Sequence, residues 1–172
     1  EGSGDMYSKG ANLLHTIRQL AKNDEVWRQT LRGLNKEFYH STVTTGEIEE
    51  YISKSIEMDL SKVFDQYLRD YRVPIFEYEI TNGVLMYRWN NVIDGFDMPL
   101  EVIIDGENTL LYPTLEFKKI PINNLYINVD DDYYVYNKDL KIIFSPKSFL
   151  FHKERSLIKF FFHNYIKLNY LR

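Results

Sequence analysis

The sequence contains no cysteine, which excludes disulfide bonds and thiolate chemistry. It also lacks a glycine-rich phosphate-binding loop and the G-x-S-x-G turn that presents a nucleophilic serine. No apolar stretch reaches the roughly 20 residues that a membrane-spanning helix needs, and the first residues do not have the pattern of a secretory signal peptide. These absences leave the compartment open, and both an exported or periplasmic and a cytoplasmic location are compatible with them.

Acidic and basic side chains are unevenly distributed along the 172 residues. Residues 1–137 carry 13 Lys and Arg against 23 Asp and Glu, whereas residues 138–172 carry 8 against 2. A nucleic-acid-binding domain presents a basic face, so the acidic body argues against nucleic acid as a partner. The hydrophobic fraction of 44% is that of a globular protein, and 14 Tyr and 11 Phe are typical of half-buried strand faces or of a binding surface.

The first part of the chain has the 3.6-residue spacing of amphipathic helices, and each expected helix has a candidate N-cap. The candidate caps are Asp5, Asn23 or Asp24, Thr44 with Glu47 in capping-box spacing, and Asp59. The positions expected to face inward are Leu13, Leu14, Ile17 and Leu20; Val26, Trp27, Leu31, Leu34 and Phe38; Ile48, Tyr51 and Ile52; and Leu60, Val63, Phe64, Tyr67 and Leu68. Pro74 ends the helical part, because the residue before a proline disfavours helix.

From Ile75 onward the apolar spacing changes to two, as in β-strands. The expected strands and turns are Phe76 to Ile80 with Glu77 and Glu79 on the opposite face, a tight turn at Asn82-Gly83, Val84 to Trp89, Leu100 to Ile104, a turn at Asp105-Gly106, Leu110 to Tyr112, Leu125 to Val129, and Tyr133 to Tyr136. The pattern predicts an α+β fold in which a helical part, residues 1–73, precedes a small antiparallel β-sandwich, residues 74–139.

Residues 140–172 differ from the rest because they are basic and aromatic and contain neither glycine nor alanine. Three interpretations of this tail remain open. It is an added helix that packs on the sandwich, a basic segment that lies on an anionic membrane surface, or sequence translated beyond the proper end of the gene.

The histidines do not form a metal-binding motif. His15, His40, His152 and His163 are scattered, and none lies four residues from another. The acidic run Asp130-Asp131-Asp132 attracts cations, but such a run is more often a solvated loop, and it lacks the glycine and terminal glutamate of a calcium loop. The residues alone therefore predict no metal site in this chain.

One short run resembles a catalytic segment of a known family. Tyr7, Lys9, Gly10 and Ala11 match the Tyr-x-Lys-Gly-Ala start of the segment that carries the catalytic tyrosine in the aminopeptidase N (gluzincin) family of zinc metallo-aminopeptidases. The resemblance covers about residues 4–137. Its further matches are Trp27-Arg28, Phe38-Tyr39, Thr44-Thr45, Asp59-Leu60 and Phe64-Asp65-Gln66-Tyr67-Leu68.

This resemblance implies a fold and a function. Residues 1–73 would be the helical end of a gluzincin-type catalytic domain, and the sandwich would follow it. Tyr7 would be the catalytic residue, whose neutral hydroxyl donates a hydrogen bond to the oxyanion that develops on the scissile carbonyl. Gly10 would let the helix of Tyr7 lie close to its neighbour.

In the family the zinc ligands and the glutamate general base lie upstream of the tyrosine, in H-E-x-x-H and a later glutamate. We therefore expect the chain to be the C-terminal part of such an enzyme. Zinc would be the cofactor and a peptide the substrate of the complete enzyme, and the missing N-terminal catalytic half would be a partner. The chain by itself is expected to bind no zinc and to be inactive. A non-catalytic binding or scaffold module derived from such an enzyme is the alternative.

Overall fold

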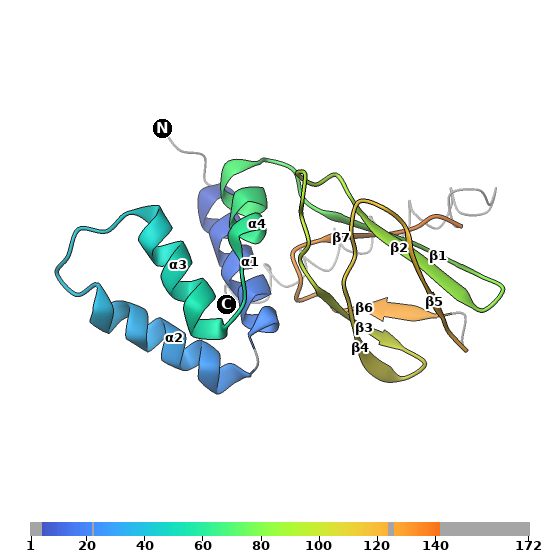
Figure 1. Cartoon of the computed structure of the whole chain (residues 1–172), viewed down its shortest axis with the longest axis horizontal. Helices are drawn as coiled ribbons and strands as arrows, with labels where there is room; N and C mark the ends of the chain where they lie inside the picture. The colour runs from blue at the N-terminus through green and yellow to red at the C-terminus, as the bar shows by residue number, and fades with distance from the viewer. Residues whose placement is uncertain (1–4, 22, 124–125, 142–172) are drawn as a thin grey trace, which may run out of the picture. The chain divides into compact units, whose positions relative to one another are not determined.

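The computed structural model describes residues 5–21, 23–123 and 126–141 (Figure 1). For Asp5 and Met6, at the start of the first helix, the backbone is described but the side chains are not. The prediction that the Asp5 side chain caps this helix therefore falls outside the described residues. The three interpretations of the tail concern residues 140–172 and fall almost wholly outside the described residues. The chain divides into two units, residues 1–138 and 139–172.

The described residues form helices followed by strands, which confirms the predicted α+β class. The helical elements are α1 (Asp5–Leu20), α2 (Asp24–Glu37), α3 (Thr45–Ile56), α4 (Ser61–Phe64) and a π-helical turn, η1 (Asp65–Arg69). The strands are β1 (Ile75–Thr81), β2 (Val84–Asn90), β3 (Leu100–Ile104), β4 (Glu107–Leu111), β5 (Lys118–Pro121), β6 (Ile127–Val129) and β7 (Tyr136–Asp139). Among the helices of the described part, none is both long and apolar enough to cross a membrane.

Two helix starts follow directly from the sequence. The Asn23 side chain accepts a hydrogen bond of 3.0 Å from the Val26 amide and so satisfies one of the free N–H groups at the start of α2. Thr44 and Glu47 form the predicted capping box, in which each side chain bonds the backbone of the other residue. Helices α2 and α3 then lie side by side in Figure 1.

Three apolar side chains predicted to face inward are exposed instead. They are Leu14 on α1, Leu31 on α2 and Leu68 in η1. Leu68 lies in the π-helical turn, where the residues per turn exceed 3.6, so the apolar stripe that begins in α4 no longer keeps its direction. The helical period therefore overestimates how far the buried face extends around each helix.

The strands form two sheets, with orders β5-β2-β1-β7 and β4-β3-β6. The two predicted hairpin turns are confirmed: Thr81 pairs with Val84 and Ile104 with Glu107, so each turn contains two residues. The return strand of the second hairpin, expected at Leu110 to Tyr112, is β4 and runs from Glu107 to Leu111 instead. Asn82 and Gly83 have φ of 53° and 74°, and Asp105 and Gly106 have φ of 57° and 88°. Both pairs thus adopt the left-handed conformation that a tight hairpin requires.

The later strands are partly different from the prediction. Strand β5 was not expected, and the expected strand at Tyr133 to Tyr136 is wrong, because β7 begins only at Tyr136. The Tyr133 side chain is buried in an irregular segment before β7. The expected strand at Leu125 to Val129 is confirmed as β6 from Ile127 on, and Leu125 lies outside the described residues.

Helices and strands share one hydrophobic core, which includes Ile17 of α1, Val63 of α4 and Phe76 of β1. Polar contacts reinforce this junction at Tyr134. Its amide donates to the Thr16 hydroxyl at 2.9 Å, and its carbonyl accepts from the Tyr67 hydroxyl at 2.8 Å. The helical part is thereby held directly against the segment that leads into β7.

Candidate functional site

Tyr7 lies in the first turn of α1, and 77% of its side chain is exposed. Between Tyr7 and Asn12 no side chain is buried, and the first buried residue of the helix after Tyr7 is Leu13. An aromatic residue at the start of a helix is normally a packing residue, and Tyr7 does not have that role within the described residues. Its hydroxyl is accessible to a molecule outside this unit.

A chain of polar contacts connects the same part of α1 to the β-strands. The Lys9 ammonium donates a hydrogen bond of 2.6 Å to the carbonyl of Asp70, which follows η1. The Asp70 carboxylate accepts from the Arg72 guanidinium and amide at 2.8 to 2.9 Å. The Arg72 guanidinium also donates to the Val92 carbonyl, which follows β2. The hydrogen bonds from Arg72 lower the pKa of Asp70 to about 2, so this carboxylate is ionised at neutral pH.

The close approach expected at Gly10 is not seen among the described residues. A Cβ atom built on Gly10 would meet no atom within 4 Å, so no element in the described part of the chain requires a glycine there. A close approach requires a glycine at Gly33 in α2 instead, where a Cβ atom would overlap the hydroxyl of Tyr51 in α3.

The described histidines have different surroundings. His15 on α1 lies 3.1 Å from the Asp132 carboxylate, which also accepts a hydrogen bond from Gln19. His40 is exposed and contacts the ring of Tyr39. His152 and His163 lie outside the described residues.

Zinc would need several ligands that converge on one point. In residues 5–21, 23–123 and 126–141 no group of three or more His, Cys, Asp or Glu side chains is arranged to hold a metal ion. The described residues therefore do not provide a site that fits the zinc ion of the aminopeptidase N family, which the sequence resembles.

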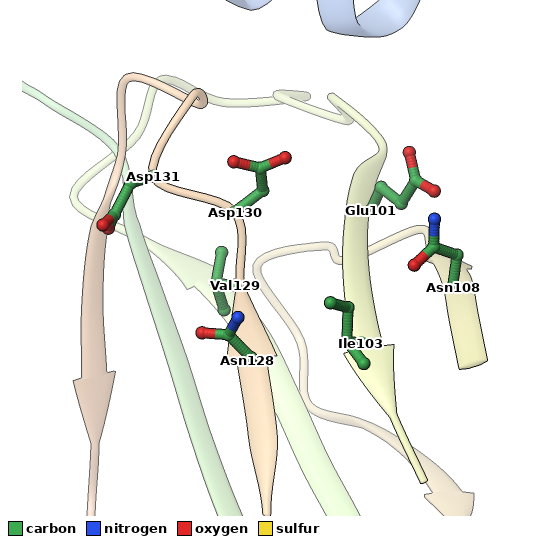
Figure 2. A pocket seen from close by; sticks show the side chains of 7 residues that line it. All are labelled: Glu101, Ile103, Asn108, Asn128, Val129, Asp130 and Asp131. Atoms are coloured by element: carbon green, nitrogen blue, oxygen red, sulfur yellow. The ribbon is translucent and has the colours of Figure 1, made fainter. Parts of the chain in front are cut away.

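A depression of about 430 Å³ lies on the sheet of β3, β4 and β6 (Figure 2). It is lined by Glu101 and Ile103 of β3, Asn108 of β4, Asn128 and Val129 of β6, and Asp130 and Asp131 of the following loop. In Figure 2 the carboxylates of Glu101 and Asp130 lie at the same end of the depression. Carboxylates and amides here can accept or donate hydrogen bonds, but the lining includes no nucleophile paired with a base.

The predicted acidic run contributes to this depression only in part. Asp130 and Asp131 line it, while Asp132 pairs with His15 of α1. The Asp130 carboxylate also accepts a hydrogen bond from the Asp132 amide at 2.9 Å. The run is exposed, as the loop interpretation expects.

A buried ionic cluster on β1 was not expected. Glu77 is 2% exposed, and its carboxylate accepts hydrogen bonds from Arg88 and Asn90 of β2 and from Lys138 of β7, at distances of 2.7 to 2.9 Å. Burial raises the pKa of this carboxyl, but the hydrogen bonds from Lys138, Asn90 and Arg88 outweigh it and lower the pKa of Glu77 to about 2. The Arg88 guanidinium also covers the ring of Phe117, 4.4 Å from its centre.

Part of this cluster can be found in the sequence. The two-residue turn at Asn82-Gly83 places Glu77 directly opposite Arg88 in the hairpin. Lys138 comes from a strand that has no apolar alternation, and its approach to Glu77 follows only from the sheet order.

The comparisons with known proteins show a likeness of fold. No protein-family model and no curated protein matches the sequence. A crystal structure of Legionella pneumophila aminopeptidase A in complex with aspartic acid is similar, with a TM-score of 0.61 and 16% sequence identity over 79% of this chain. The chain has an aminopeptidase-like fold. It spans 18% of the length of that enzyme.

Proposed function

We propose that the chain is part of a zinc-dependent aminopeptidase, which removes N-terminal residues from peptides, and that Tyr7 stabilises the transition state. The exposed position of Tyr7 carries this proposal. Its side chain is 77% exposed on a turn that precedes the first packed residues of α1, so its hydroxyl is available to a substrate. The ordered matches to the aminopeptidase N family and the aminopeptidase-like fold support the same function.

The chemistry proposed for Tyr7 is a single hydrogen bond. When a nucleophile attacks the scissile peptide bond, negative charge develops on the carbonyl oxygen. A neutral phenol donates one directional hydrogen bond to this oxyanion without bringing a charge of its own. A donor of this kind acts mainly in the transition state, so it contributes to kcat more than to substrate binding.

The proposal assigns the metal ligands and the general base to another part of the enzyme, because the described residues do not fit a zinc ion. The enzyme's N-terminal catalytic half would supply them as a partner of this chain. The chain alone is then inactive, and zinc is the cofactor only of the complete enzyme.

The test is the Tyr7→Phe substitution in the complete enzyme. We expect kcat for an alanyl arylamide to fall by about 10² to 10³, the effect of removing one oxyanion donor, with little change in KM or in zinc content. Tyr39→Phe is the matched control, because Tyr39 is equally exposed, at 75%, and precedes α3. An unchanged kcat in the Tyr7→Phe enzyme would refute the catalytic role.

A second candidate function is a non-catalytic binding or scaffold module. Exposed tyrosines in the β part favour it, since Tyr112, Tyr126 and Tyr136 are between 57% and 71% exposed, and tyrosine is common in recognition surfaces. The coding sequence immediately upstream distinguishes the two candidates. An in-frame H-E-x-x-H motif with a later glutamate would support the peptidase, and a sequence without them would favour the module.

A further inference from the structure

The start of α1 projects beyond the packed part of the helix. Tyr7 precedes Leu13, the first buried residue after it, by six positions, which corresponds to about 9 Å along a helix. The first four amides of a helix have no carbonyl partner within it. Short helical segments without packed side chains are also only marginally stable in water. The turns that carry Tyr7 therefore need an anchor if the hydroxyl is to have a defined position.

Lys9 provides that anchor. Its ammonium, in a half-buried side chain, donates a hydrogen bond of 2.6 Å to the carbonyl of Asp70, a residue 61 positions away. A bond with a charged donor is stronger than one between neutral groups. From Tyr7 to Asn12 it is the one side-chain hydrogen bond to the rest of the described protein.

The acceptor of this bond is itself held in place. Asp70 receives three hydrogen bonds from Arg72, and Arg72 donates a further one to Val92 after β2. The anchor therefore connects the start of α1 to the segment that follows β2, through Asp70 and Arg72, which have several partners each. A carbonyl at the end of a mobile loop would not constrain the helix in this way.

The spacing of the two residues determines the direction of Tyr7. Successive helical residues are rotated by about 100°, so residues two apart point in nearly opposite directions. When Lys9 holds one side of the first turns against Asp70, Tyr7 points away from this contact, which agrees with its high exposure.

We propose that Lys9 is a positioning residue for Tyr7: its hydrogen bond to the Asp70 carbonyl holds the first turns of α1 so that the Tyr7 hydroxyl has a defined position toward the substrate. This inference rests on the proposed function of Tyr7. It assigns Lys9 a role that acts through Tyr7, by way of the hydrogen bond to Asp70.

The first experiment measures the anchor in the chain itself. In Lys9→Met, which keeps an unbranched side chain as far as Cε but removes the ammonium donor, we expect amide hydrogen exchange at residues 9–12 to become about tenfold faster, the effect of losing one charge-assisted hydrogen bond. Exchange within residues 13–20 and the melting temperature should not change. Lys9→Arg should restore slow exchange. Lys54→Met is the control, because Lys54 is an exposed lysine on α3 that pairs with Glu50.

The second experiment measures the consequence for catalysis in the complete enzyme. We expect Lys9→Met to lower kcat about tenfold with an unchanged KM, because a small misplacement of a catalytic group lowers the rate, and Lys9→Arg to restore it. The same Lys9→Met substitution should have no further effect in a Tyr7→Phe background, because the residue acts through Tyr7. An equal loss in both backgrounds would overturn the proposal, and so would unchanged exchange in Lys9→Met.

The two experiments separate this inference from the proposed function. If Tyr7→Phe leaves kcat unchanged, the catalytic function of Tyr7 fails whatever Lys9 does. If Tyr7→Phe lowers kcat and Lys9→Met does not, the function stands and only the positioning role of Lys9 is wrong.

Discussion

We expect Glu77→Gln to lower the free energy of unfolding by about 3 kcal/mol at pH 7. The carboxyl has an ordinary pKa of 4.5, and its pKa in the folded protein is about 2. Each tenfold change in proton affinity corresponds to about 1.4 kcal/mol, and the amide cannot accept a proton or carry the charge that its partners require.

Two features of the structure limit the loss to this size. Removing one partner of a fully buried ion pair leaves a charge without compensation and costs more than a solvated pair would. Here the side chains of Arg88 and Lys138 are 34% and 41% exposed, so water can solvate them when the carboxylate is replaced. The glutamine also keeps an oxygen that can accept a hydrogen bond from Asn90.

The pH dependence gives a sharper test. Because folding lowers the pKa of Glu77, its contribution is fully present above pH 4.5 and is lost as the pH falls toward 2. Urea unfolding between pH 7 and pH 2.5 should therefore show two stability curves that converge in acid. The control is Glu79→Gln on the same strand, where the carboxylate accepts one bond from the Thr81 hydroxyl, and we expect a loss below about 1 kcal/mol. If the Glu77→Gln protein is as stable as the original at pH 7, or the two curves stay parallel, the reasoning is wrong.

Two further substitutions test the packing of the helices. In Gly33→Ala the new methyl group would overlap the Tyr51 hydroxyl, so we expect a loss of about 1 to 3 kcal/mol in thermal unfolding. Gly46→Ala, at a helical position with no atom within 4 Å of the new methyl, should instead leave stability unchanged or raise it by up to about 1 kcal/mol. In Thr44→Ala the capping box with Glu47 is lost, and we expect about 1 kcal/mol of destabilisation by the same measurement. Equal melting temperatures of Gly33→Ala and Gly46→Ala, or of Thr44→Ala and the original protein, would contradict these predictions.

The sequence determines the features that depend on neighbours within a few residues. The cap at Asn23 bonds a residue three positions on, and the capping box of Thr44 and Glu47 has the same spacing. The turn at Asn82-Gly83 needs only two residues that tolerate positive φ. Interactions of this range are complete within the local segment, so the sequence is sufficient to predict them.

Edge strands and exposed helix faces were not predictable in this way. Strands β5 and β7 lie at the two edges of their sheet and lack apolar alternation, so their strand structure depends on pairing with distant segments. Leu14 and Leu31 have the spacing of buried residues, yet both are exposed. Apolar spacing identifies the face of a helix that can be buried, but the tertiary structure decides which residues of that face are packed against another element.

The candidate site likewise has features that the sequence predicts and features that only the tertiary structure shows. The matches around Tyr7 are a property of the sequence, and they make it the candidate catalytic residue. Three other features follow only from the tertiary structure. They are the exposure of Tyr7, the hydrogen bond from Lys9 to a carbonyl 61 residues away, and the burial of Glu77 beside Lys138. The physical reason is that these features depend on contacts between groups far apart in the sequence, in the helical part, in the hairpin of β1 and β2, and in β7. The spacing of apolar residues within one segment does not predict contacts between segments.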